Sequence, residues 1–188
     1  SNLELFTTLA HEGFPGHLYQ TVYFGRQNPS HIRYLIDHSG YVEGWATYAE
    51  SYAYDYAADY LSSGQTASRE DAAFARLCWL NRSVNLCIYS LMDTGIHYRG
   101  WTPAQSARFL KLFGIRDASV TAEIYRYITE TPANYLKYYA GYLNFLDLKE
   151  EQQALLGENF DLKAFHQQLL TIGPVQFPVL RKYISEKL

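Results

Sequence analysis

The stretch Tyr41-Val-Glu-Gly-Trp-Ala-Thr-Tyr-Ala-Glu-Ser-Tyr-Ala-Tyr-Asp-Tyr-Ala-Ala-Asp-Tyr-Leu61 decides the fold class. It contains neither Gly nor Pro after Gly44, and its aromatic residues recur at the spacing of one face of an α-helix. These aromatic residues are Trp45, Tyr48, Tyr52, Tyr56 and Tyr60. The pattern therefore predicts one long helix from Tyr41 to Leu61.

Helical patterns also occupy most of the chain on either side of this stretch. We expect further helices at about 3–12, 17–24, 68–98, 102–114, 119–129, 131–155 and 161–173, with a last one at the C-terminal end. No stretch alternates apolar and polar residues as a half-buried strand would. The sequence predicts an all-α, multi-helix fold in a single domain over residues 1–188. Ser1-Asn2 resembles an expression scar, and we expect the rest to be a fragment of a longer protein.

Composition and charge exclude several classes of protein. The chain has 188 residues, with 16 Lys and Arg against 19 Asp and Glu, so its formal charge of −3 argues against a nucleic-acid-binding surface. A hydrophobic content of 48% excludes general disorder. Cys78 and Cys87 are too few for a disulfide framework or a Cys-based zinc site. We expect a soluble protein, either cytoplasmic or exported.

The segment His11-Glu12-Gly13-Phe14-Pro15-Gly16-His17 contains the residue types of a catalytic zinc site. Two imidazoles can ligate the metal, while the Glu beside the first one faces a water molecule. The two histidines are six residues apart, about 600° around an ideal helix, so a straight helix cannot direct both at one ion. Gly13, Pro15 and Gly16 predict a kink between them. The alternative is a pair of ordinary histidines at a helix end.

A third ligand is available in the long helix. Glu43, Thr47 and Glu50 stand at i, i+4 and i+7, hence on one face. Burying two acids there requires a partner, and a divalent cation or a ligating histidine would be suitable. We predict Glu43 as the carboxylate ligand. For Glu50, a hydrogen bond to a ligand and simple exposure are both open.

Four motifs in order resemble the bacterial domain-of-unknown-function family 885. They are His-Glu-Gly-x-Pro-Gly-His, Glu-Gly-Trp-Ala-x-Tyr-Ala-Glu, Asp93-Thr94-Gly95-Ile96-His97 with Gly100-Trp101, and Phe160-Asp161-Leu162 with Phe165-His166. The resemblance covers nearly the whole chain and lies in the C-terminal part of longer family members. It implies a zincin-like, gluzincin-type catalytic domain in which His11, His17 and Glu43 ligate Zn²⁺ and Glu12 is the general base.

The chain departs from the family pattern near its middle helices. The family tends to have Pro-Gly-Gln and then Tyr-Lys where this chain has Pro132-Ala133-Asn134 and Tyr138-Tyr139, which argues against a role for a cation there. Tyr138 remains a candidate donor to the oxyanion of a hydrolytic reaction.

Other histidines have less specific settings. Asp93 and His97 are at i, i+4, so Asp93 could orient and charge His97 as a second donor to the oxyanion; a surface pair is the alternative. His166 lies on an amphipathic helix, where a hydrogen-bonded core or cleft histidine is expected. His31 and His38 fall in a polar connection and are expected to be solvated.

These observations predict a zinc-dependent hydrolase acting on short peptides. A metal-activated water would attack the peptide bond, with Glu12 accepting its proton. One alternative is a non-catalytic helical module that retains the metal site and is inactive as a fragment. Another is a hydrolase for a non-peptide amide or ester. The expected partners are a peptide-like substrate and the missing N-terminal region of the same chain, but no nucleic acid.

Overall fold

The computed structural model describes residues 1–36, 38–63 and 69–185, and every regular element in these ranges is a helix. The α-helices are α1 (Asn2–Glu12), α2 (His17–Gly25), α3 (Ser39–Ser63), α4 (Arg69–Asp93), α5 (Pro103–Lys111), α6 (Ala118–Glu130), α7 (Leu136–Leu156), α8 (Leu162–Ile172) and α9 (Phe177–Ser185). Short 3₁₀ turns lie at His31–Tyr34 and Gly157–Asn159, and a π-helical turn lies at Thr94–Tyr98. The predicted all-α fold is confirmed. Among the described helices, none is both long enough and apolar enough to span a bilayer.

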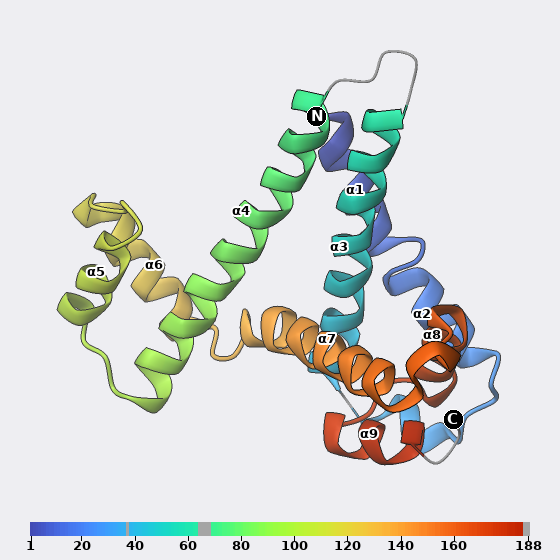
Figure 1. The fold of residues 1–188 in the computed structure, drawn as a ribbon. Coiled ribbons are helices and arrows are strands. Elements are labelled where there is room, and N and C mark those ends of the chain that lie inside the picture. Colours follow the sequence, from blue (N-terminus) through green and yellow to red (C-terminus); the bar gives the residue numbers. More distant parts are fainter. Residues whose placement is uncertain (37, 64–68, 186–188) are drawn as a thin grey trace.

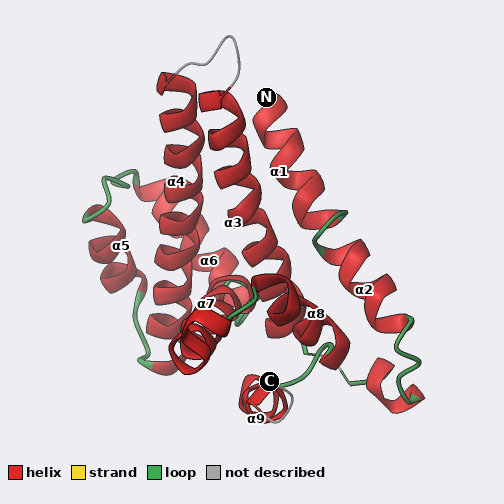
Figure 2. Cartoon of the chain, turned by 45° about the vertical axis from the view of Figure 1, so that its right-hand side comes forward, coloured by secondary structure: helices red, strands yellow, loops and turns green. Residues whose placement is uncertain are grey.

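Helix α3 is the centre of the molecule. It packs against α7, α4 and α1, and Figure 1 shows α7 crossing the lower part of the α3–α4 pair. Helices α5 and α6 pack on each other beside the C-terminal end of α4, while α8 contacts α2 and α9. Figure 2 shows α1 and α2 one after the other along one side of α3. The face of α3 that carries Glu43 and Glu50 is thus enclosed by three other helices.

Two glycines, Gly44 and Gly141, bring α3 and α7 into close contact. A Cβ atom at Gly44 would lie 2.5 Å from the backbone carbon of Gly141, and one at Gly141 would lie 2.2 Å from the Gly40 carbonyl oxygen. No side chain fits at either Gly44 or Gly141, so the two backbones touch at this crossing. The contact places the first turn of α7 beside Glu43.

The aromatic stripe of α3 enters the core only over its first half. Trp45 and Tyr48 are buried in the main cluster with Phe145 of α7, whereas Tyr56 and Tyr60 are 64% and 78% exposed. The period of the stripe therefore predicted the helix correctly, but helical spacing alone did not show where along α3 the covering helices end.

Helix α7 begins later than the sequence predicted. Residues 131–135 form turns, and the helix starts at Leu136 rather than at Thr131-Pro132. Ala133 has a φ of +61°, which an α-helix cannot contain, and its backbone N–H donates a 2.7 Å hydrogen bond to Asp93 Oδ2. A tertiary contact with the end of α4 therefore sets the start of α7. From there α7 continues through Gly141 without interruption.

Candidate metal centre

The two motif histidines lie on two helices joined by a four-residue loop. Helix α1 ends at Glu12 and α2 begins at His17, so the chain breaks between the histidines as the separate patterns at 3–12 and 17–24 predicted, through a loop rather than a kink in one helix. The Gly16 N–H donates to the Ala10 carbonyl at 2.9 Å, which turns the loop back onto α1. A Cβ at Gly16 would lie 1.8 Å from the His11 carbonyl oxygen, so only glycine permits this return. Because the loop reverses the chain, both imidazoles can face one point although they are six residues apart.

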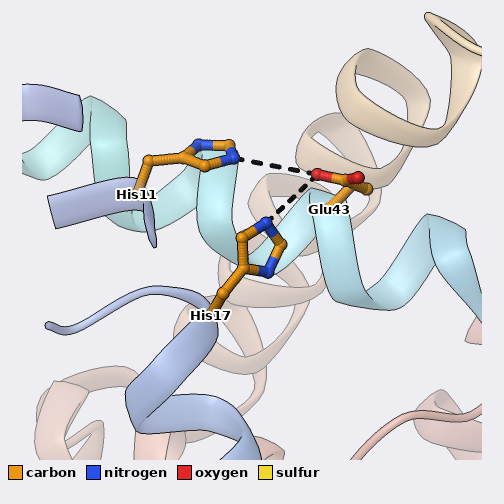
Figure 3. A group of neighbouring side chains, drawn as sticks. All are labelled: His11, His17 and Glu43. Atoms are coloured by element: carbon orange, nitrogen blue, oxygen red, sulfur yellow. Dashed lines mark ion pairs between the residues drawn. The ribbon is translucent and has the colours of Figure 1, made fainter. Parts of the chain in front are cut away.

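His11, His17 and Glu43 converge on one point, as the sequence predicted. Glu43 Oε2 is 3.2 Å from His17 Nε2 and 3.7 Å from His11 Nε2, and Figure 3 shows both rings directed at this oxygen. One ligand atom from each residue lies within 4.8 Å of the others. Ligands at zinc distances of about 2.0–2.2 Å in a tetrahedron are about 3.4 Å apart, so the spacing suits a zinc ion.

The state of Glu43 also fits a cation. Its Oε2 atom is buried and forms no hydrogen bond within the described part of the chain. Burial alone would raise the pKa of Glu43, but His11, His17 and Lys137 hold it well below its usual range. The carboxylate is therefore ionised, with one oxygen left for a ligand that hydrogen bonding does not replace.

Glu50 contacts the other side of His11. Its Oε2 lies 3.0 Å from His11 Nδ1, and its Oε1 accepts a 3.2 Å hydrogen bond from Arg82 Nε on α4. This contact favours the His11 tautomer with a proton on Nδ1 and a lone pair on Nε2 toward Glu43. Of the two alternatives for Glu50, the structure supports the hydrogen bond, because only 7% of this side chain is exposed.

Two carboxylates favour the protonated form of His11 when the site holds no cation. Burial lowers its pKa, yet Glu43 and Glu50 more than compensate and raise it to about 9. A cation at Nε2 would have to displace that proton, so metal binding at this site releases protons.

Tyr138 and Lys137 approach the same centre from α7. The Tyr138 ring stacks on His11 at 6.2 Å between centroids, and burial together with Glu43 raises its pKa to about 12. Lys137 Nζ is 3.3 Å from Glu43 Oε1. The departure from the family pattern argued against a role for a cation here, yet Lys137, directly before Tyr138, contacts the Glu43 oxygen that does not face the histidines.

A cleft of about 540 Å³, here called the His11 cleft, opens beside these residues. It is lined by Glu4, Thr7, Thr8, His11, Glu12, Glu50, Tyr54, Arg82, Leu86, Asn134, Tyr135 and Tyr138. The exposed Glu12 side chain lies at this cleft next to His11. The predicted ligands, base and Tyr138 are thus gathered in one region.

The structure does not bring His97 or Asp93 to this region. His97 Nε2 is 3.0 Å from the Ile128 carbonyl oxygen of α6, and Asp93 accepts a hydrogen bond from the Ala133 N–H. Neither residue lines the His11 cleft. His97 is therefore not placed to stabilise an oxyanion at this centre. The Ile128 carbonyl contacts His97, and the Ala133 N–H contacts Asp93.

The motif that contains Asp93 and His97 instead packs the end of α4. A Cβ at Gly95 would lie 2.3 Å from the Trp101 ring, so the indole lies flat on this glycine. Asp93 holds the turn before α7, and α7 carries Lys137 and Tyr138. Within this motif, Asp93 therefore affects the site indirectly, through the position of α7.

His166 is hydrogen-bonded, as expected for a core or cleft histidine. Its Nε2 is 2.9 Å from the Tyr48 hydroxyl, and its ring meets those of Trp45 and Tyr52. Burial and Lys149 lower its pKa to about 4.

Two residues of the site were missed by sequence reasoning. Arg82 and Lys137 come from α4 and α7, far along the chain from the histidine motif. A cation on an amphipathic helix has no local signature, so only the tertiary contacts identify these two.

Comparison with known proteins decides the family. The model of a family described as bacterial protein of unknown function, DUF885, matches residues 1–184. The chain belongs to the DUF885 family. This DUF885 chain is also similar to the structure of a putative lipoprotein of unknown function from Shewanella oneidensis, with 26% identity and a TM-score of 0.74. The match covers 97% of this chain and 32% of the lipoprotein, so the chain spans about a third of that protein. No curated protein matches it.

Proposed function

We propose that this DUF885 chain is the metal-binding part of a zinc-dependent hydrolase that cleaves short peptides, with a zincin-like, gluzincin-type ligand set. The observation that carries the proposal is the convergence of His11 Nε2, His17 Nε2 and Glu43 Oε2, with the last atom buried and without a hydrogen bond. Two imidazoles and one carboxylate are a ligand set of catalytic zinc sites, which keep a fourth position for water.

Each residue would have a distinct task. His11, His17 and Glu43 would hold the ion, which when bound supplies Lewis acidity and lowers the pKa of a water molecule. Glu50 keeps the lone pair of His11 Nε2 directed to the centre. Lys137 binds the second Glu43 oxygen and so favours ligation through the first oxygen alone.

Glu12 is the proposed general base. Its exposed carboxylate lines the His11 cleft, where it can take a proton from the attacking water and later donate it to the leaving amine. The Tyr138 hydroxyl, neutral because its pKa is about 12, remains able to donate a hydrogen bond to a developing oxyanion.

The test measures zinc and hydrolysis separately. We expect the purified protein to bind one zinc per chain by elemental analysis, and His17→Ala to abolish that binding. Glu12→Gln should retain zinc but lose hydrolysis of a peptide library, whereas Glu4→Gln, on the same helix and the same cleft, should retain both. Hydrolysis that survives Glu12→Gln would overturn the base assignment, and absence of stoichiometric zinc would overturn the proposal.

A second candidate is a helical module that binds metal without catalysis. It is favoured by the absence of His97 from the His11 cleft, which leaves Tyr138 as the main candidate for oxyanion stabilisation. Stoichiometric zinc without hydrolysis of any peptide would support this candidate.

A further inference from the structure

Arg82 is the arginine that lines the His11 cleft, and most of its N–H donors are not engaged by the described residues around it. Its Nε donates to Glu50, and 41% of the side chain is exposed. Within residues 1–36, 38–63 and 69–185, its two terminal nitrogens form no hydrogen bond. The guanidinium is thus held at one edge by a buried carboxylate while its other donors remain available to a ligand.

The surroundings place this guanidinium inside the cleft. Tyr54, Tyr135 and Asn134 line the same cavity as Arg82. Burial raises the pKa of both tyrosines, and Arg82 acts in the opposite direction on each, so its charge is felt at both hydroxyls. Three carboxylates also line the cleft, but Glu50 is paired with Arg82 and Glu4 with the N-terminal amine. The remaining donors of the guanidinium, beside neutral polar groups, suit an anion.

The planar shape of the guanidinium favours a carboxylate as the bound anion. A guanidinium forms two parallel hydrogen bonds to a carboxylate, with charge assistance on both. Glu50 links Arg82 to His11, the one candidate ligand that lines this cleft, so an anion on Arg82 lies on the Nδ1 side of His11, away from the Nε2 lone pair. A peptide bound here could have its carboxyl end at Arg82 and an internal peptide bond at the metal centre.

We propose that Arg82 binds the C-terminal carboxylate of the peptide substrate, so that the enzyme acts on peptides with a free carboxyl end. The inference rests on the proposed function and adds the substrate class to it. Arg82 is a specificity-determining residue in this proposal, distinct from the groups that hold the ion or move protons.

Binding measurements on an inactive variant test the proposal without relying on turnover. In zinc-loaded Glu12→Gln protein, titration calorimetry would compare acetyl-trialanine with a free carboxylate and acetyl-trialanine amide. We expect the free acid to bind at least tenfold more tightly. Adding Arg82→Gln should remove this preference, while zinc content stays at one per chain.

Arg76→Gln provides a matched control. Arg76 also lies on α4 and pairs with an acid of α3, Asp59, at 3.2 Å, but it does not line the His11 cleft. It should leave the preference for the acid intact. If Arg82→Gln does not fold, Arg82→Lys keeps the charge and should lose most of the preference, because an ammonium lacks the paired donors.

The outcomes separate this inference from the function it rests on. Equal binding of acid and amide, no binding of the acid, or a preference that survives in Arg82→Gln would overturn the role of Arg82, even if zinc and hydrolysis are present. Absence of zinc from the protein would overturn the proposed function instead.

Discussion

The indole Nε1 of Trp45 donates a 2.9 Å hydrogen bond to the carbonyl oxygen of Pro15. This bond joins α3 to the loop between the two motif histidines. Trp45 lies two residues after Glu43, so one turn of α3 supplies both a proposed ligand and the support for the loop that joins the helices of the other two. The Glu-Gly-Trp sequence is therefore understandable as one structural unit.

Replacing Trp45 by Phe should loosen this unit. The Phe ring keeps most of the packing but leaves the Pro15 carbonyl unpaired, which costs about 1–3 kcal/mol of unfolding free energy. We expect zinc to bind several-fold more weakly as well, because the orientation of His17 depends on the loop. Chemical unfolding and zinc titration measure the two effects.

Trp101→Phe is the control for this change. Trp101 packs on Gly95 at the far end of α4, so its loss should lower stability without changing zinc affinity. Equal zinc affinity in wild-type protein and Trp45→Phe would show that the loop does not need the α3 hydrogen bond.

Glu50→Gln should weaken metal binding while the fold is retained. The amide can still contact His11, but it lacks the charge that orients the imidazole, and loss of such partners typically costs 10–100-fold in metal affinity. Competition with a chromogenic chelator measures the change. Glu151→Gln, which removes the charge of an exposed partner of Arg181, should leave zinc affinity unchanged. A wild-type zinc affinity in Glu50→Gln would refute the role of Glu50.

The sequence was sufficient to predict the helices and the three converging side chains. Both predictions rest on local patterns: aromatic and apolar spacing for the helices, and a His-Glu pair with helix-breaking residues for the site. The return of the chain at Gly16 was not predictable, because a glycine between two histidines is equally compatible with a kink. The choice depends on whether its N–H reaches the Ala10 carbonyl.

Contacts between distant segments explain the other errors. The spacing of Asp93 and His97 made them neighbours on one helix, but their partners are backbone groups at Ala133 and Ile128. Lys137 was passed over although it precedes the candidate Tyr138, because the family pattern has its Lys directly after a Tyr. Its role follows from the glycine crossing that brings α7 against α3.

Gly141→Ala should disturb that crossing. The added methyl group would meet the Gly40 carbonyl at 2.2 Å, and since that atom belongs to a helix backbone, α3 and α7 must separate. We expect a loss of at least about 1–3 kcal/mol in unfolding free energy, as for other overpacked sites, although alanine is the better helix former.

Gly40→Ala is the matched control, because its Cβ would meet only the Phe177 ring at an ordinary 4.0 Å. It should leave unfolding free energy nearly unchanged. Gly141→Ala protein that is as stable as wild type would show that the helices can separate without loss.

His166 should make the stability of the protein depend on pH. Its pKa is about 4 in the folded protein, against about 6.5 in the unfolded chain, so the unfolded state binds more protons between these values. The contribution of the neutral His166 is present above pH 6.5 and is lost as pH falls toward 4. Between pH 7 and pH 5 we expect a loss of about 1–2 kcal/mol from this residue.

Urea unfolding of His166→Gln at pH 7, 6 and 5 isolates this contribution. The amide can still bond to the Tyr48 hydroxyl but does not titrate, so its unfolding free energy should fall less over this interval than that of wild type. His31→Gln, which changes an exposed histidine, should follow the wild-type curve. Parallel curves for wild type and His166→Gln would mean that His166 accepts a proton in the folded state as readily as in the unfolded chain, in conflict with its packing among Trp45, Tyr48 and Tyr52.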